Sequence, residues 1–466
     1  MKKFKSIVNV FFMLAITITG SFAADYQNIV TFGDSLTDSG NLFLVTSDTP
    51  NSYYYKDGRF SNGPIWAEYL SSRLGINGRF LLASSNQENI SERTFFNNAF
   101  GGAETGSDAS PPGFLTQINL WKQYGLFIPE NSLCIVWIAA NDILNWLSDN
   151  TEIDGAEEVV NTSVENIITG LTDLVENLYA TDIMVINLPD LGRTPRFNYY
   201  GTELASNISN LFNNTLKTEL ELFSGNNPII KLIQMDILSI MDKIFRNPSN
   251  YGIQNITDAA IYYESFQMEV FDNIGKFLFW DPIHPSTQTH KIISDQIYGM
   301  TFIEFEDEDV IFLETNTDKS IIGISSQQED ITFQSIISGS SEDNTSLDNK
   351  PDIFIYDILE CSINVETNNF AELTIYLPYE APSDSEWYNE TDNGWVNFDK
   401  SLLDDSNGDG AVFSGDRKSI TLHITDNGNY DDDETSGMVR LSSGLGTKYE
   451  IIDDNSGSGC FISVLQ

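Results

Sequence analysis

The alternation of two hydrophobic patterns over the first 300 residues constrains the fold more than any other feature of this 466-residue sequence. Short, largely apolar runs at 29–32, 133–138 and 183–186 have the length and composition of buried strands. The segments 159–179 and 203–223 repeat apolar residues at the spacing of an amphipathic helix. Because strands that alternate with helices form parallel sheets covered by helical layers, this region is predicted to be an α/β domain.

The pattern changes near residue 303. Beyond an acidic stretch at 304–309, residues 371–377 and 419–425 alternate apolar and polar side chains, as half-buried strands do, and no long helical segment separates them. Residues 304–466 also hold 35 of the 68 acidic residues but only 7 of the 24 basic ones. We therefore expect an α/β domain at 24–302 and a smaller, acidic, β-sandwich-like domain at 303–466.

The N-terminus has the three-part order of a secretory signal peptide. Lys2, Lys3 and Lys5 precede an apolar run at 8–18, and small residues up to Ala23 follow it. Cleavage after Ala23 would remove residues 1–23 as the signal peptide. No later run approaches the roughly 20 apolar residues of a membrane span, so we expect a protein that is secreted or associated with the cell envelope.

Charge and residue spacing exclude several classes of function. The formal net charge is −44, and a field of that sign repels phosphate backbones, so no nucleic-acid partner is expected. The three histidines and three cysteines form no HExxH or CxxC motif, and no zinc site is expected. Cys134 lies in an apolar run and is expected in the core, whereas Cys460 is predicted either to pair with Cys361 or to be an attachment point.

A serine follows the first predicted strand directly, in the sequence Gly33-Asp34-Ser35. Parallel sheets place their ligand crevices at the carboxyl ends of strands, where a nucleophilic hydroxyl is well situated. The alternative is a strand-ending turn in which Ser35 only caps the next helix. A general base elsewhere in the chain decides between the two.

The segment 279–285, which reads Phe-Trp-Asp-Pro-Ile-His-Pro, offers that base. Pro282 and Pro285 bias the residues before them, Asp281 and His284, toward extended backbone. A carboxylate three residues before an imidazole can fix its tautomer, so that the other ring nitrogen takes the serine proton. The alternative is an exposed loop histidine beside an acid, but neither His290 nor His423 has such a neighbouring carboxylate in the sequence.

An attacking serine also requires donors for the developing oxyanion. The glycine turn at 97–103 contains Gly102, whose backbone NH can approach a ligand closely, and the segment 137–142 places the amide of Asn141 after the second strand. The alternatives are an ordinary loop and a helix N-cap at Asn141 or Asp142.

These four segments, in this order, resemble the signature blocks of the GDSL lipases and esterases, also called SGNH hydrolases. The resemblance covers about residues 26–300 and includes the stretches 57–70 and 187–195. It implies a three-layer α/β/α fold without a catalytic metal or cofactor. It also implies Ser35 as nucleophile, His284 as general base, Asp281 as its orienter, and an oxyanion hole formed by Ser35, Gly102 and Asn141. One position departs from the family pattern: Ala139 stands where glycine is usual, two residues before Asn141.

The C-terminal region carries two further signals. Residues 350–450 resemble the choice-of-anchor β domains of exported bacterial proteins, which implies attachment at the envelope or cell surface. Asp405, Asn407 and Asp409 stand at positions 1, 3 and 5 of a calcium-loop pattern that ends with Asp416 at position 12. A strand pattern follows rather than a helix, so the prediction is an isolated structural calcium loop, with a solvated turn as the alternative.

The function expected from the sequence is secreted ester hydrolysis through an acyl-serine intermediate, with a lipid or phospholipid as substrate. A phospholipase, a lysophospholipase or a lipid acyltransferase would use the same residues. The alternative from another class is a surface binding protein with a degenerate hydrolase fold.

Overall fold

The structure is a computed structural model. It describes residues 26–447 except 85–92, 109, 199, 265–266, 308, 317–318, 329–330, 340–348, 367–368, 392–393, 404–405. The predicted signal peptide at 1–23 and the tail containing Cys460 therefore lie outside the described residues.

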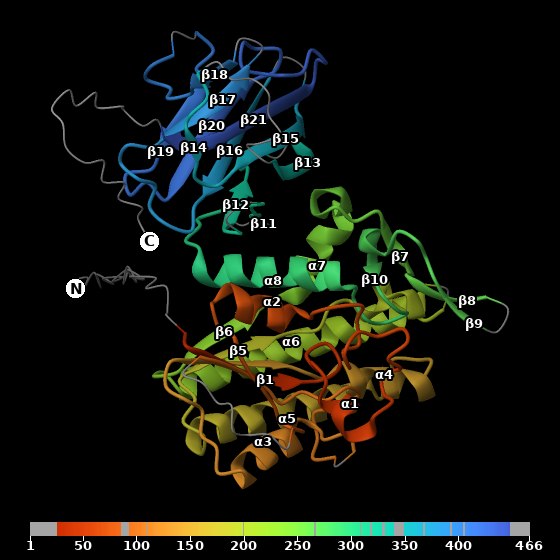
Figure 1. Ribbon diagram of the computed structural model, residues 1–466. Coiled ribbons are helices and arrows are strands. Elements are labelled where there is room, and N and C mark those ends of the chain that lie inside the picture. The colour runs from red at the N-terminus through yellow and green to blue at the C-terminus, as the bar shows by residue number, and fades with distance from the viewer. Residues whose placement is uncertain are drawn as a thin grey trace, which may run out of the picture.

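A six-stranded parallel sheet forms the centre of the N-terminal domain (Figure 1). Its strand order is β2-β3-β1-β4-β5-β6, and every neighbouring pair is parallel. The strand order changes direction at β1: β3 and β2 lie on one side of it, and β4, β5 and β6 lie on the other. The strands are β1 (Asn28–Gly33), β2 (Gly78–Leu81), β3 (Thr94–Asn97), β4 (Ser132–Trp137), β5 (Asp182–Ile186) and β6 (Lys231–Met235).

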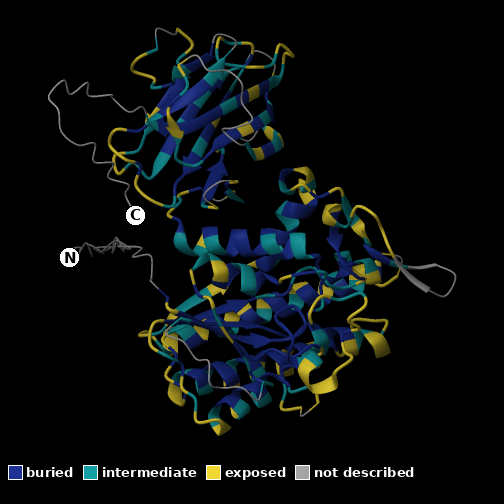
Figure 2. Cartoon of the chain, in the orientation of Figure 1, coloured by how far each residue is buried: buried dark blue, intermediate teal, exposed yellow. Residues whose placement is uncertain are grey.

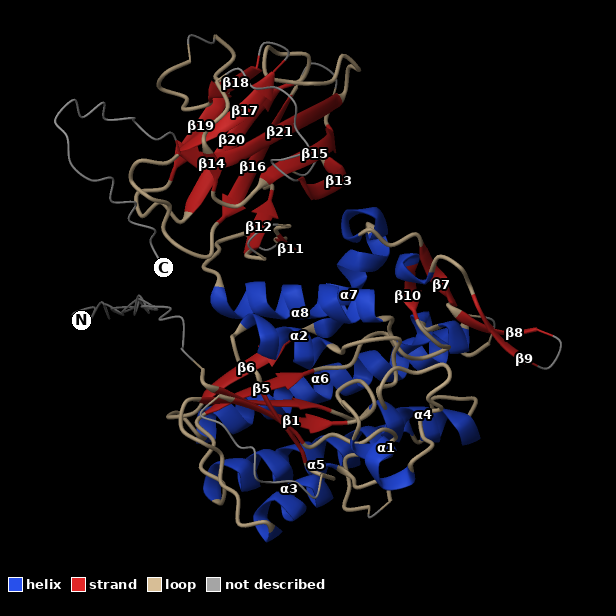
Figure 3. Cartoon of the chain, viewed as in Figure 1, coloured by secondary structure: helices blue, strands red, loops and turns tan. Residues whose placement is uncertain are grey.

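Helices cover both faces of this sheet (Figure 3). Alternate strand residues such as Phe32 and Val136 pack with α3, α5 and α6, and those between them, such as Ile29 and Ile135, pack with α2, α7 and α8. Because both faces are covered, the sheet is dark in the burial view of Figure 2. The helices are α1 (Asn41–Thr46), α2 (Trp66–Arg73), α3 (Phe114–Gln123), α4 (Ala140–Asp149), α5 (Ala156–Glu176), α6 (Thr202–Asn226), α7 (Ile237–Arg246) and α8 (Thr287–Phe302).

The predicted α/β/α architecture is confirmed. The strands expected at 29–32, 133–138 and 183–186 are β1, β4 and β5, and the two expected helices are α5 and α6. Two smaller ladders extend the domain: β7 (Asn255–Ala259) with β10 (Phe277–Phe279), and a hairpin of β8 (Ile261–Glu264) and β9 (Gln267–Val270). Among the described residues, no helix is long and apolar enough to cross a bilayer.

The C-terminal region is a separate antiparallel β-sheet domain. One sheet has the order β11-β12-β16-β20-β19 and the other β13-β15-β21-β17-β18, with β14 beside β21. Their inward-facing residues, including Leu373, Leu422 and Leu441, share one core, as in a sandwich. The strands are β11 (Ile311–Glu314), β12 (Ile321–Ser325), β13 (Thr332–Gly339), β14 (Ile353–Phe354), β15 (Ile358–Asn364), β16 (Phe370–Tyr376), β17 (Glu386–Thr391), β18 (Gly394–Asn397), β19 (Gly410–Phe413), β20 (Ser419–Thr425) and β21 (Met438–Thr447).

The two domains meet at α8 and β11, which lie next to each other in Figure 1. Arg73 of α2 contacts Glu314 of β11 at 2.6 Å and Asp295 of α8 at 2.5 Å. The ring of Phe312 packs directly against Gly299, where an added Cβ would lie 2.1 Å from the ring. The interface therefore combines a largely buried ionic cluster with close apolar packing.

Candidate active site

Three loops that follow neighbouring strands converge at the carboxyl end of the sheet. Ser35 follows β1, Gly102 follows β3 and Asn141 follows β4. Because β1 lies between β3 and β4 at the point where strand order reverses, these loops flank one crevice. All three residues line the same pocket, together with His284.

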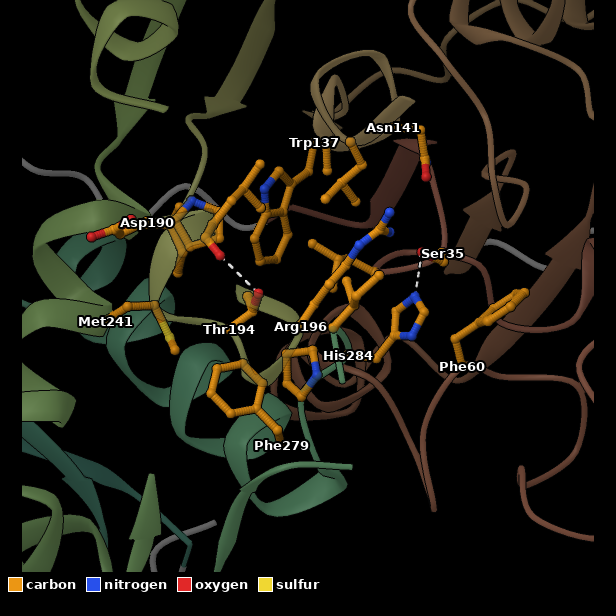
Figure 4. A pocket seen from close by; sticks show the side chains of 18 of the residues that line it. Ser35, Phe60, Trp137, Asn141, Asp190, Thr194, Arg196, Met241, Phe279 and His284 are labelled. Atoms are coloured by element: carbon orange, nitrogen blue, oxygen red, sulfur yellow. Dashed lines mark hydrogen bonds between the residues drawn. The ribbon is translucent and has the colours of Figure 1, made fainter. Parts of the chain in front are cut away.

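Ser35, His284 and Asp281 form a hydrogen-bonded chain. Nε2 of His284 lies 2.8 Å from Oγ of Ser35, and Nδ1 lies 2.6 Å from Oδ2 of Asp281 (Figure 4 draws the first of these). The turn between β10 and α8 holds the pair, because the Trp280 NH donates to the carbonyl of His284. A proton on Nδ1, donated to the carboxylate, leaves the lone pair of Nε2 facing the serine hydroxyl. The geometry is that of a general base poised on a nucleophile.

The Asp281 carboxylate is fully engaged. Its Oδ1 accepts the backbone NH groups of Ile283 and His284 at 2.8 and 2.7 Å, and its Oδ2 accepts the Tyr55 hydroxyl at 2.7 Å as well as the imidazole. Burial raises the pKa of Asp281, but the charge of His284 and these hydrogen bonds outweigh that effect and lower it. The carboxylate is therefore ionised and rigidly aimed. Sequence reasoning missed Tyr55, which lies 226 residues from Asp281 in the chain.

The electrostatics of His284 suit a base. Burial lowers its pKa, but the charge and hydrogen bond of Asp281 more than compensate, and the pKa is raised above its ordinary value of 6.5. The other two histidines differ. His290 is buried in α8, where burial lowers its pKa to about 3. His423 of β20 does contact a carboxylate in the folded chain, because its Nδ1 lies 3.2 Å from Oδ1 of Asp409, but both residues belong to the β domain.

The oxyanion donors predicted from the sequence lie around Ser35. Gly102 lines the pocket and has a φ of +78°, a backbone conformation that glycine adopts without strain. Among the described residues, the NH groups of Gly102 and Ser35 donate to no acceptor. The side-chain amide of Asn141 donates one hydrogen to the carbonyl of Ala103 at 2.9 Å, so its second N–H is available to a ligand. The arrangement can stabilise a negative oxygen beside the serine.

Two aspartates whose roles sequence reasoning missed, the buried Asp38 and the half-buried Asp142, hold these loops together. Asp38 accepts four backbone NH groups: those of Gly40, Asn41 and Leu42 in its own loop, and that of Gly101 in the loop after β3. Burial raises the pKa of Asp38 to about 6, against the lowering effect of these four donors. Asp142 likewise accepts the NH and hydroxyl of Thr105. The nucleophile and oxyanion loops are thus cross-linked.

Ala139 adopts the backbone conformation that explains the usual glycine at this position. Its φ is +96° and its ψ is −8°, a region that glycine enters freely and alanine enters with strain. Its side chain is fully buried between β4 and α4. The alanine therefore introduces local backbone strain two residues before Asn141, which lines the pocket with Ser35.

The pocket beside Ser35 has a volume of about 260 Å³ and is mostly apolar. In Figure 4, Trp137, Met241 and Phe279 gather toward one end, and Ser35, His284 and Asn141 lie toward the other. These apolar residues come from β4 of the central sheet, from α7 and from β10 of the small ladder, and they belong to one core cluster. The cavity therefore places a mostly apolar surface next to the reactive groups.

The described residues of the predicted calcium loop, Asn407, Asp409 and Asp416, do not lie together around one site. Asp405 lies outside the described residues, and Asn407 is exposed. Asp409 is buried and accepts the NH and hydroxyl of Thr425 at 2.9 and 2.7 Å. Asp416 lies beyond the opposite end of β19, in the exposed turn before β20. The strand between Asp409 and Asp416 separates the ligands expected at positions 5 and 12, and calcium binding stays a prediction for the remaining residues.

The predicted partner of Cys460 is buried. Cys361 lies in β15 with 1% of its surface exposed, and it is a free thiol among the described residues, as is Cys134 in β4. Burial raises the pKa of both thiols. Cys460 itself is outside the described residues.

Comparison with known proteins gives consistent matches. Residues 29–297 match the model of the family described as GDSL-like lipase/acylhydrolase. A GDSL esterase/lipase of Arabidopsis thaliana is 26% identical over 349 residues, which are 65% of this chain and 99% of the relative. The phosphatidylcholine-sterol acyltransferase of Aeromonas hydrophila is 26% identical over 353 residues, 64% of this chain and 96% of the relative. The thermolabile hemolysin of Vibrio parahaemolyticus is 26% identical over 297 residues, 58% of this chain and 63% of the relative.

Proposed function

The chain belongs to the GDSL-like lipase/acylhydrolase family, and on that premise we propose that it cleaves carboxylic esters through an acyl-serine intermediate. The observation that carries the proposal is the continuous chain from Ser35 Oγ through both nitrogens of His284 to Asp281, at 2.8 and 2.6 Å. A serine, an oriented base and free oxyanion donors in one pocket are the requirements of acyl transfer to and from an enzyme.

The reaction follows from this geometry. Nε2 of His284 takes the Ser35 proton as Oγ attacks the ester carbonyl, while Asp281 stabilises the imidazolium. The NH groups of Ser35 and Gly102 and the Asn141 amide bind the developing oxyanion. His284 then gives its proton to the departing alcohol, which leaves the acyl group on Ser35. Water, activated by the same imidazole, releases the acid and restores the serine.

The apolar pocket supports a lipid as the acyl donor. Trp137, Met241 and Phe279 line it, and burial of each methylene of an acyl chain there contributes about 0.8 kcal/mol. Two of the similar proteins are named as a lipase/esterase and as an acyltransferase of phosphatidylcholine. A long-chain acyl ester of a lipid or phospholipid is therefore the substrate we propose.

Acyl transfer is the second candidate, because one relative is named for it. The first half-reaction is the same, and an alcohol replaces water in the second. The alternative of a binding protein with a decayed active site is opposed by the intact set of Ser35, His284, Asp281 and oxyanion donors.

Export is part of the proposal. Lys2, Lys3 and Lys5, the apolar run at 8–18 and Ala23 support a signal peptide and hence a secreted or envelope-associated protein. Attachment at the surface rests on the resemblance of 350–450 to anchoring β domains and stays a prediction.

The test is turnover of a panel that contains p-nitrophenyl esters of increasing chain length, triacylglycerols, phosphatidylcholine and an acetylated glycan, each with and without a sterol acceptor. We expect free fatty acid from the long-chain esters, and a sterol ester as well if transfer occurs. The folded Ser35→Ala protein is the control. Release of acetate alone would redirect the proposal to deacetylation, and no product from any ester would refute it.

A further inference from the structure

Arg196 is the one lysine or arginine among the described residues that line the active-site pocket. The chain carries a net charge of −44, so a cation at this position stands out from its surroundings. In Figure 4 its side chain extends between the apolar residues, such as Trp137, and the reactive pair of Ser35 and His284. The guanidinium therefore belongs to the same pocket as the reactive pair.

The backbone fixes Arg196 beside the catalytic turn. It belongs to the short 3-10 helix Pro195–Phe197, and its NH donates to the carbonyl of Pro282, between Asp281 and His284, at 2.9 Å. Its guanidinium donates to Oγ of Ser148 at the end of α4 at 3.1 Å. Arg196 thereby connects the turn that holds His284 with the C-terminal end of α4, the helix that contains Asn141.

The guanidinium has donors to spare. Among the described residues, no carboxylate oxygen lies within 4.0 Å of it, and besides the hydrogen bond to Ser148 its Cζ lies over the Phe197 ring, 5.6 Å from the ring centroid. The neighbouring Arg193, by contrast, is paired with Asp242 at 2.9 Å. Asp190, the nearby acid of the pocket, accepts from the NH of Gly192 and the hydroxyl of Ser206. Arginine offers five donors in a planar fork, and one is used here.

We propose that Arg196 binds a phosphate group carried by the alcohol part of the ester, which makes a glycerophospholipid the favoured substrate. The proposal rests on the proposed function and adds the substrate class. Arg196 lines the pocket and is exposed. In the proposed complex the acyl chain occupies the apolar end of the pocket, and the exposed guanidinium binds the phosphate of the alcohol part. A guanidinium binds a phosphate through two parallel hydrogen bonds. It also offsets locally the repulsion that the acidic chain exerts on an anion.

The experiment compares two esters of the same fatty acid, a lysophosphatidylcholine and a monoacylglycerol, dispersed in the same nonionic detergent. They differ in the phosphocholine group alone. A third substrate, lysophosphatidic acid, separates the phosphate from the choline. For wild type we expect a higher kcat/KM on both phosphate-bearing esters than on the monoacylglycerol. Arg196→Gln should lower kcat/KM by about 10- to 100-fold on the phosphate-bearing esters and leave the monoacylglycerol within about twofold.

Two further variants complete the design. Arg196→Lys keeps the charge but loses the planar fork, and it should recover part of the lost activity on the phosphate-bearing esters. Arg246→Gln removes one positive charge from an exposed side chain that pairs with Asp242 outside the pocket, and it should match wild type on all three esters.

The outcomes distinguish the role of Arg196 from the proposed hydrolase function. A loss confined to the phosphate-bearing esters supports the inference. An equal loss on all three esters in Arg196→Gln and Arg196→Lys would overturn it and assign the Arg196 side chain a structural role through Ser148 of α4, while the proposed hydrolase function would stand. No turnover of any of the three by wild type would refute the proposed function and the inference with it.

Discussion

Tyr55 donates its hydroxyl to Oδ2 of Asp281 at 2.7 Å, the same oxygen that accepts the imidazole of His284 at 2.6 Å. The loop 51–62, which follows the nucleophile, therefore reaches across the site and fixes the orienting carboxylate. Phe60 of the same loop packs against the His284 ring with centroids 5.2 Å apart. His284 is thus held in place by Asp281, which Tyr55 fixes, and by the ring of Phe60.

Tyr55→Phe removes one of the four hydrogen bonds to Asp281. We expect kcat to fall by about 3- to 30-fold, because a less constrained carboxylate orients His284 less well. The pKa of His284 should rise, since a carboxylate that has lost a donor attracts the imidazolium proton more strongly. The acid limb of the kcat/KM profile should then shift to higher pH. Tyr53→Phe, at a hydroxyl-bearing ring that is 84% exposed, is the matched control and should change neither quantity.

Activity should depend on pH through His284. The base must be neutral, so kcat/KM falls as pH drops through its pKa, and that midpoint should lie above 6.5 because Asp281 raises it. In Asp281→Asn the midpoint should move to lower pH, since the stabilising charge is gone, and a measurable fraction of activity should remain. His284→Ala should retain almost none. Equal rates in wild type and His284→Ala would remove the assignment.

Asp38→Asn tests the cross-link between the nucleophile and oxyanion loops. In the native protein both carboxylate oxygens of Asp38 accept backbone NH groups, including that of Gly101. An asparagine replaces one of these oxygens with an NH₂ group, which cannot accept a hydrogen bond, so at least one of these backbone NH groups loses its acceptor. We expect kcat to fall by about 10- to 100-fold, as the Gly102 donor moves away from the oxyanion. Asp48→Asn, on the exposed surface nearby, removes the same charge and should be silent. Unchanged affinity for an oxyanion-mimicking boronate in Asp38→Asn would count against this role.

Gly299→Ala tests the contact between the domains. A Cβ there would lie 2.1 Å from Cγ of Phe312, so the β domain must shift, and we expect a loss of about 1–3 kcal/mol in urea unfolding. Gly225→Ala places the same methyl on α6 with nothing within 4 Å and should be neutral or stabilising by up to about 1 kcal/mol. Equal unfolding midpoints would show that Phe312 is not closely packed against α8.

Much of the fold could be predicted because its central strands are strongly patterned. The runs that became β4 and β5 are almost wholly apolar, since helices cover both faces. The strands β2, β3 and β6 were not anticipated. Each has only four or five residues, and β6 at the sheet edge is largely exposed or half-buried, so its pattern does not stand out from loop.

The site could be predicted as far as its residues lie in short local motifs. Ser35, Gly102, Asn141 and the Asp281–His284 pair each follow a strand or sit in a distinctive turn. Tyr55 and Arg196 carry no such signal, because their partners are set by tertiary packing over long sequence separations. Asp38 had a weak signal as an acid within the nucleophile loop, yet its reach to Gly101 depends on the adjacency of β1 and β3.

The most direct test of the central claim is the rate of ester hydrolysis by Ser35→Ala on a neutral p-nitrophenyl ester, measured on protein whose circular dichroism and melting temperature match wild type. The hydroxyl-to-hydrogen change removes the nucleophile and little packing, so we expect kcat to fall by at least about 10⁴-fold. A folded Ser35→Ala protein that hydrolyses the ester at the wild-type rate would contradict it.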